Sequence, residues 1–91
     1  MTNLIHTMVR VLDLKRSLCF YADVLGLHEA HRLDLPDFAL DYLRNVENDV
    51  EIELTLNKGR TEPYTHGTGD GHIGVVVADV SATHAALTGK G

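Results

Sequence analysis

The sequence lacks several features that would place it in a specialised class. It has a single cysteine, Cys19, so no disulfide can form within the chain, as is typical of proteins in the reducing cytoplasm. Its eight lysines and arginines are scattered, and the net charge of −5 argues against a nucleic-acid or anionic-membrane surface. No apolar run has the length of a signal sequence or a membrane span. We therefore expect a soluble cytoplasmic protein that binds neither nucleic acid nor membrane.

The length and residue balance fit one small domain or part of one. The chain has 91 residues, of which 44% are hydrophobic and 23% charged, as in ordinary globular proteins. A chain of this size buries little more than half of its unfolded surface, so its core contributes limited stability.

The start of the sequence recurs 66 positions later. Residues 6–17, HTMVRVLDLKRS, align with residues 72–83, HIGVVVADVSAT, with a histidine, two valines and an aspartate identical in place. Such a repeat indicates one supersecondary unit used twice. His6 and His72 are then expected at equivalent positions on two related strands.

The first copy predicts one helix and four strands. A strand is expected over residues 4–11, followed by a helix over 14–25 with Asp13 as its N-cap and Gly26 at its end. Alternating patterns predict three further strands, at about 28–33, 38–42 and 50–57. The predicted fold class is α+β, with a βαβββ module at residues 1–57.

The second copy is expected to begin after a glycine-containing linker at residues 58–70. Residues 71–91 would then start a second βαβββ module, with a strand at 71–77 and a helix at 82–87. We expect the remainder of that module to follow Gly91.

Alternation along the strands assigns their side chains to faces. Val9 and Val11 are predicted to meet the helix, as are the apolar residues of 50–57. The opposite face then carries His6 and Arg10 from the first strand, His72 from its repeat, and the polar positions of the last strand, which are Glu51, Glu53, Thr55 and Asn57. On the other strands, His28 and His31 are expected to be solvated. Phe38, Leu40 and Tyr42 are expected in the core or, alternatively, in an apolar substrate pocket.

Two readings of that polar face are open. A solvated face is the ordinary explanation of such a pattern. A metal site is the alternative, because two imidazoles and a carboxylate suit zinc, nickel or cobalt, and histidine recurs at the same place in both copies.

Three segments of the sequence resemble glyoxalase I, the lactoylglutathione lyase family of the vicinal-oxygen-chelate superfamily. They are IHTMVRVLDLKRSLCFYADVLGL at 5–27, VEIELTLNKG at 50–59 and DGHIGVVVADV at 70–80. They occur in the family's order and spacing and are distributed from residue 5 to residue 80.

The resemblance implies paired βαβββ modules and one divalent metal ion, nickel, cobalt or zinc. It implies His6, Glu53 and His72 as metal ligands, and Arg10, Thr55 and Asn57 as substrate-binding residues. The implied reaction converts the hemithioacetal of methylglyoxal and glutathione to S-D-lactoylglutathione, by proton transfer through an enediolate.

The implied catalytic base is a metal-bound glutamate late in the second module. The same 66-residue shift from Glu53 leads to a position near 119, beyond Gly91. No catalytic base is therefore assigned among the 91 residues.

Two other functions keep the same fold. One is a different metal-dependent enzyme of the superfamily, such as an epimerase or a dioxygenase. The other is a metal-free protein that binds or sequesters a ligand. We expect a homodimer in which His6 and Glu53 of one chain meet His72 of the other.

Overall fold

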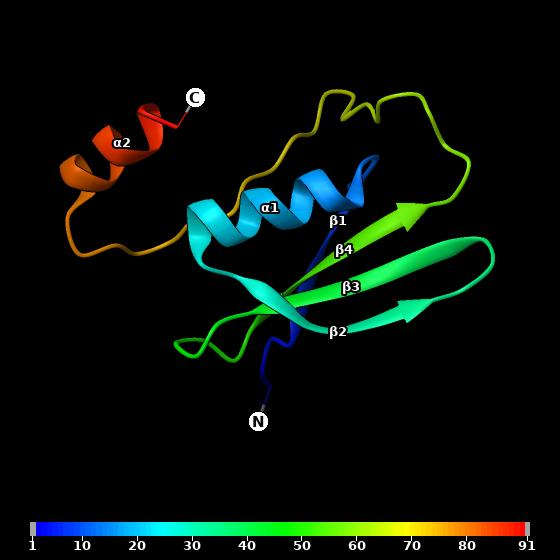
Figure 1. Cartoon of the computed structure of the whole chain (residues 1–91), viewed down its shortest axis with the longest axis horizontal. Coiled ribbons are helices and arrows are strands. Elements are labelled where there is room, and N and C mark those ends of the chain that lie inside the picture. Colours follow the sequence, from blue (N-terminus) through cyan, green and yellow to red (C-terminus); the bar gives the residue numbers. More distant parts are fainter. Residues whose placement is uncertain (1, 91) are drawn as a thin grey trace.

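The computed structural model describes residues 2–90, and its elements follow the predicted βαβββ order (Figure 1). The fold is α+β, as expected, and the observed ends lie within about two residues of the predicted ones. The elements are β1 (His6–Val11), α1 (Leu14–Leu25), β2 (His28–Asp34), β3 (Phe38–Arg44), β4 (Glu51–Asn57) and α2 (Val80–Thr88).

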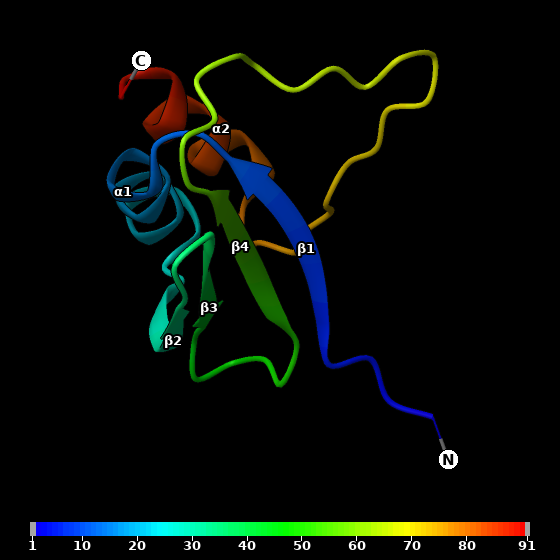
Figure 2. The same cartoon turned by 90° about the vertical axis from the view of Figure 1, so that its right-hand side faces the viewer.

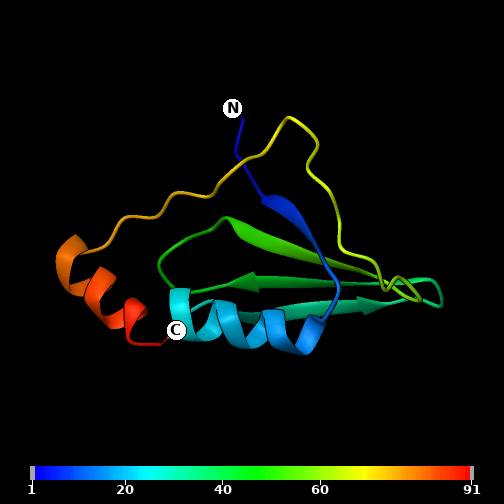
Figure 3. The ribbon, with the colours of Figure 1, turned by 90° about the horizontal axis from the view of Figure 1, so that it is seen from above.

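The strands form one mixed sheet in the order β1-β4-β3-β2. β1 and β4 pair in parallel, whereas the other two ladders are antiparallel. A parallel pair needs a crossover connection, and here that connection includes α1, which lies along one face of the sheet (Figure 3). The first and last strands of the module are therefore neighbours.

Helix α1 begins and ends where the sequence predicts. The Asp13 carboxylate accepts the backbone N–H of Arg16 at 3.0 Å, so it caps the first turn. Gly26 has φ 64°, a left-handed conformation in which glycine carries no steric penalty. Its N–H donates to the carbonyl of Ala22 at 3.1 Å, and the chain then turns into β2.

The core lies between α1 and the sheet. Its buried centre is Leu27, Leu43, Ile52 and Leu54, with Val9, Val11, Leu14, Leu18, Tyr21 and Leu25 packed around it. The predicted orientation of β1 and β4 is therefore confirmed. The polar positions of these two strands face away from α1.

The predicted orientation of Phe38, Leu40 and Tyr42 toward the core is wrong. Ala39, Asp41 and Leu43 are the buried residues of β3, and the alternate positions are only half-buried on the open face. The error arises because both phases of residues 38–43 carry apolar residues, so alternation alone favoured the phase that lacks Asp41.

Asp41 is a fully buried carboxylate on the α1 side of the sheet. Its Oδ2 accepts hydrogen bonds from Nε and Nη2 of Arg32, at 3.0 and 2.9 Å. Its Oδ1 has no hydrogen-bond partner among residues 2–90. The pKa of Asp41 is raised to about 6, chiefly because burial disfavours the charged form and next because the Glu29 carboxyl lies beside it.

The strand predicted at residues 71–77 is not formed. This stretch pairs with no strand within residues 2–90. The outer edge of β1 therefore has no neighbouring strand in the part of the chain that the structure describes. α2 follows with Asp79 as its N-cap, as expected, and contributes no buried residue. It lies beyond the end of the sheet (Figure 1). The division into a first module, a linker and a second module stays a prediction.

Neither α1 nor α2 has the length and apolar character that crossing a bilayer would require, within the residues described.

Asp41 predicts an unusual pH dependence of stability. Between about pH 4 and pH 6 the native state keeps the Asp41 proton while the unfolded chain releases it, so the free energy of unfolding falls as the pH rises. A pKa raised from 3.8 to about 6 corresponds to about 3 kcal/mol at most. Because Asp41→Asn is neutral at every pH, it should gain stability relative to the unmodified protein between pH 4 and pH 8. Urea unfolding at several pH values measures this.

The control is Asp23→Asn, which removes an exposed carboxylate from α1. Its stability difference from the unmodified protein should be constant over the same range. An Asp41→Asn difference that is equally constant would contradict the raised pKa.

Candidate active site

The face of the sheet opposite α1 brings polar and aromatic side chains together from all four strands. The register places His31 opposite Tyr42, Tyr42 opposite Glu53, and Glu53 opposite Met8. One row therefore crosses the sheet from β2 to β1. His6 lies one pleat away from Met8 on the same face of β1.

Two of the three predicted metal ligands meet on this face. His6 Nε2 lies 3.3 Å from Glu53 Oε1, and the side chains are 35% and 13% exposed. Both are thus reachable from solvent while Glu53 is largely enclosed. An imidazole nitrogen and a carboxylate oxygen at this separation are donors that zinc, nickel and cobalt accept. The pair supplies part of a ligand set.

Thr55 holds the second oxygen of that carboxylate. Its hydroxyl donates to Glu53 Oε2 at 3.3 Å, and the residue is only 7% exposed. The substrate-binding role of Thr55 stays a prediction. Here its hydroxyl restrains Glu53.

Tyr42 and His31 extend the site, for which the sequence offered Tyr42 only as the alternative of a substrate-pocket residue and did not suggest His31. The Tyr42 ring stacks on His31, with centroids 4.4 Å apart, and meets His6 edge-on at 5.6 Å. The pKa of Tyr42 is raised, chiefly by its hydrogen bond with Glu53. His31 is exposed, as expected for the polar strand β2, but its contact with the site was not predicted. No sequence signal places it here, since its orientation depends on a bulge in β2.

Asn57 is joined to the segment that follows β4. Its Nδ2 donates to the Tyr64 hydroxyl at 2.9 Å, and the Arg60 guanidinium lies 4.1 Å from the centre of the Tyr64 ring. Arg60 also donates to the carbonyls of Glu62 and Pro63. The start of the predicted linker is therefore tied down beside Asn57, and Tyr64 is a neighbour that the sequence did not suggest.

Arg10 and His72 lie at a cavity of about 860 Å³ along the outer edge of β1. Its walls come from β1, the C-terminal half of α1, and two stretches of the connecting segment, 64–66 and 71–73. That segment runs past β1 on the side away from β4 (Figure 2). Arg10 is exposed there, so its guanidinium is accessible to an anionic ligand.

One chain does not bring the three predicted metal ligands together. Among residues 2–90, no three histidine, cysteine, aspartate or glutamate side chains converge closely enough to hold a metal ion. His6 and Glu53 form a pair, and His72 stands apart on the connecting segment. Within one chain, His6 and Glu53 are therefore suitable donors for a divalent ion, but they provide only two of the three predicted ligands.

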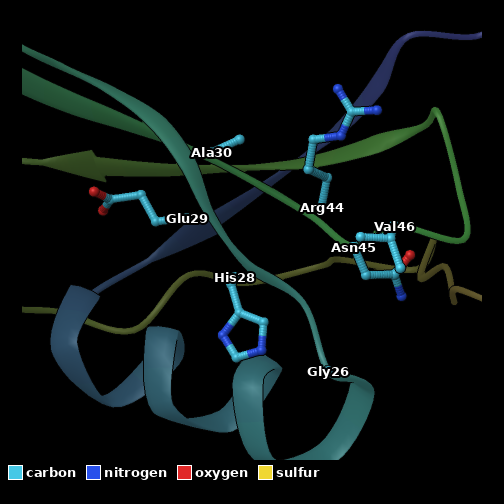
Figure 4. A pocket seen from close by; sticks show the side chains of 7 residues that line it. All are labelled: Gly26, His28, Glu29, Ala30, Arg44, Asn45 and Val46. Carbon is cyan, nitrogen blue, oxygen red and sulfur yellow. The ribbon is translucent and has the colours of Figure 1, made fainter.

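A second cavity, of about 520 Å³, lies where α1 passes into β2. Gly26, His28, Glu29, Ala30, Arg44, Asn45 and Val46 line it. The side chains of His28 and Arg44 extend in different directions rather than toward one point (Figure 4). None of the predicted site residues lies there, so the open face of the sheet is the better candidate.

Comparison with known proteins identifies relatives of the whole chain. The model of the Glyoxalase/Bleomycin resistance protein/Dioxygenase superfamily matches residues 3–91. The lactoylglutathione lyase of Haemophilus influenzae is 42% identical over 97% of this chain and 67% of its own length. The probable lactoylglutathione lyase of Synechocystis is 43% identical over 97% of this chain and 70% of its own.

A solved structure agrees with these relatives. The trypanothione-dependent glyoxalase I of Leishmania major superposes with a TM-score of 0.87 at 34% identity, over 99% of this chain and 67% of its own. The chain thus spans about two thirds of the length of these three proteins.

The Asn57–Tyr64 contact predicts how firmly the connecting segment is held. Tyr64→Phe removes the hydroxyl and keeps the ring beneath Arg60. A net hydrogen bond contributes about 1 kcal/mol, so local opening should become about fivefold more frequent. Trypsin cleavage after Arg60 should accelerate by about the same factor.

Tyr21→Phe, which removes a phenol from α1, is the matched control and should leave this cleavage rate unchanged. Equal rates for Tyr64→Phe and the unmodified protein would show that the contact does not restrain the segment.

Proposed function

We propose that this chain, which belongs to the glyoxalase/bleomycin resistance protein/dioxygenase superfamily, is a metal-dependent lactoylglutathione lyase. The proposal starts from its similarity to glyoxalase I enzymes. The proposed reaction converts the methylglyoxal–glutathione hemithioacetal to S-D-lactoylglutathione. The observation that carries the proposal is the His6–Glu53 pair on the open face of the sheet. The unpaired, exposed Cys19 is in keeping with a cytoplasmic setting.

The proposed metal site combines residues of two chains. His6 and Glu53 of one chain are the first two ligands, and His72 of a second chain is the third. A nickel, cobalt or zinc ion bound there would act as a Lewis acid toward the oxygens of the substrate. Support comes from the 3.3 Å spacing of the pair and from the position of His72 outside it.

The outer edge of β1 supports a shared site. It is an unpaired strand edge within residues 2–90, and such edges are normally covered in a native assembly. Beside it, the extended segment exposes Ile73, Val75 and Val76. A second copy of the chain at this edge would bury them and bring a second His72 toward the first copy's His6–Glu53 pair.

The surroundings of Glu53 favour a ligand role for it rather than that of the base. Its Oε1 faces His6, the other proposed ligand, and its Oε2 accepts from Thr55, so the carboxylate is restrained in a position beside that imidazole. A proton carrier needs a carboxylate oxygen free to approach two adjacent substrate carbons. We assign that role to the equivalent glutamate of the second copy, expected near position 119.

Arg10 and Asn57 are the proposed substrate-binding residues. The Arg10 guanidinium is exposed at the large cavity and can bind a carboxylate of the thiol. Asn57 lies at the end of β4 with Tyr64 beside it, where its amide can donate to a peptide carbonyl. In the alternative, a metal-free binding protein, the His6–Glu53 contact would be an ion pair of the open face.

A complementation experiment tests the shared site. His6→Ala and His72→Ala should each lower bound Ni²⁺ at least tenfold in equilibrium dialysis, because each removes a ligand from every site. Mixed and refolded together, the two variants should regain metal binding. A dimer with one chain of each kind contains one intact site.

His28→Ala, an exposed histidine away from the pair, is the control and should bind metal normally. Unchanged metal content in both variants would exclude these residues as ligands. Loss without recovery on mixing would place all the ligands in one chain.

Arg10 tests the substrate. Arg10→Met should raise KM for the hemithioacetal by about 10- to 100-fold, because a hydrogen bond to a charged group contributes about 1.5–3 kcal/mol. The kcat should change little, since Arg10 is proposed to bind a part of the substrate remote from the reacting carbons. Turnover is followed by formation of the thioester product. An unchanged KM would show that Arg10 does not bind the thiol.

A further inference from the structure

A bulge in β2 determines which residues of that strand reach the candidate site. Glu29 pairs with Leu43, and the next pair is His31 with Tyr42, so Ala30 is an extra residue. Without it, Ala30 would oppose Tyr42 and His31 would oppose Asp41 on the α1 side. Bulges commonly redirect side chains beside functional sites. Here the bulge turns the His31 imidazole onto the open face.

Tyr42 is held between two imidazoles as a result. The His31 ring lies nearly parallel to the Tyr42 ring, at 19° and 4.4 Å, and the His6 ring meets it at 74° and 5.6 Å. Stacked and edge-on arrangements at these distances are both favourable for aromatic rings. The phenol therefore has little rotational freedom, although β2 itself is exposed along its length.

The Tyr42 phenol lies beside a proposed metal ligand. Tyr42 lies directly opposite Glu53 in the β3–β4 ladder, and the carboxylate interacts with the phenol. The same carboxylate faces His6 through Oε1 and Thr55 through Oε2. A carboxylate with three such neighbours is oriented before any ion binds.

We propose that Tyr42, braced by His31, is a positioning residue that orients the Glu53 carboxylate toward His6 for a divalent ion. This inference rests on the proposed function, because that proposal supplies the divalent ion. Partners that orient metal ligands are normally hydrogen-bonded groups around them, and their loss lowers metal affinity. Because the glutamate side chain has several rotatable bonds, an ion that meets it already ordered loses less entropy on binding.

The test measures binding of Co²⁺ alone to the intact chain, through its visible absorption. Tyr42→Phe keeps the ring and both aromatic contacts and removes only the hydroxyl. It should raise the dissociation constant about tenfold and alter the Co²⁺ spectrum. His31→Leu, which removes the stacked ring, should raise it about threefold. Tyr21→Phe removes a phenol on the α1 side and should change neither quantity.

The outcomes separate this inference from the proposed function. If Tyr42→Phe binds Co²⁺ as tightly as the unmodified protein while His6→Ala does not bind it, the positioning role is overturned and the metal site stands. If the unmodified protein binds no Co²⁺, the proposed function fails. The inference is then decided on the metal-free protein.

That second measurement uses three-bond scalar couplings of the Glu53 side chain. A single rotamer in the unmodified protein that becomes averaged in Tyr42→Phe supports positioning by the hydroxyl. An identical rotamer distribution in both proteins overturns it.

Discussion

The parallel pairing of β1 with β4 is the constraint on which the rest of the structure depends. It follows from the crossover through α1, and it makes the first and last strands of the module neighbours. The register that directs Val9 and Leu54 into the core also directs His6 and Glu53 onto the opposite face. A slip by one residue would exchange the two faces. The geometry of the site is therefore fixed by the packing of the core.

The ion pair between the buried Asp41 and the exposed Arg32 has a similar role for the outer strands. Burying a carboxylate in a small core costs free energy that the pairing only partly returns. What the pair adds is specificity of register, because only the bulged alignment places Arg32 opposite Asp41. In the regular alignment, His31 would face that carboxylate instead. The pair thus favours the alignment of β2 in which the His31 ring also stacks on Tyr42.

The sequence predicted the βαβββ order, both helix caps and the two faces of β1 and β4, because those signals are local and regular. It failed where the outcome depends on a partner. The sequence could not predict which residues of β3 face the core. Asp41 is among them only because Arg32 reaches it from β2. The stretch at 71–77 has the composition of a strand but pairs with none within residues 2–90. Tyr64 became a neighbour of Asn57 through a loop path that no periodicity encodes. The pairing of His6 with Glu53 was suggested by alternation and by resemblance, whereas the contribution of His31 required the bulge.

Ala30 links two parts of the molecule that could otherwise change separately over evolution. Loss of this one residue would withdraw Arg32 from Asp41 and His31 from the open face in a single step. A homologue without the bulge would need new residues both beside Asp41 and beside Tyr42 at the same time. Few series of neutral substitutions would therefore remove the bulge. Covariation among descendants should accordingly join positions 31, 32, 41 and 42, which lie on opposite sides of the sheet, into one inherited unit.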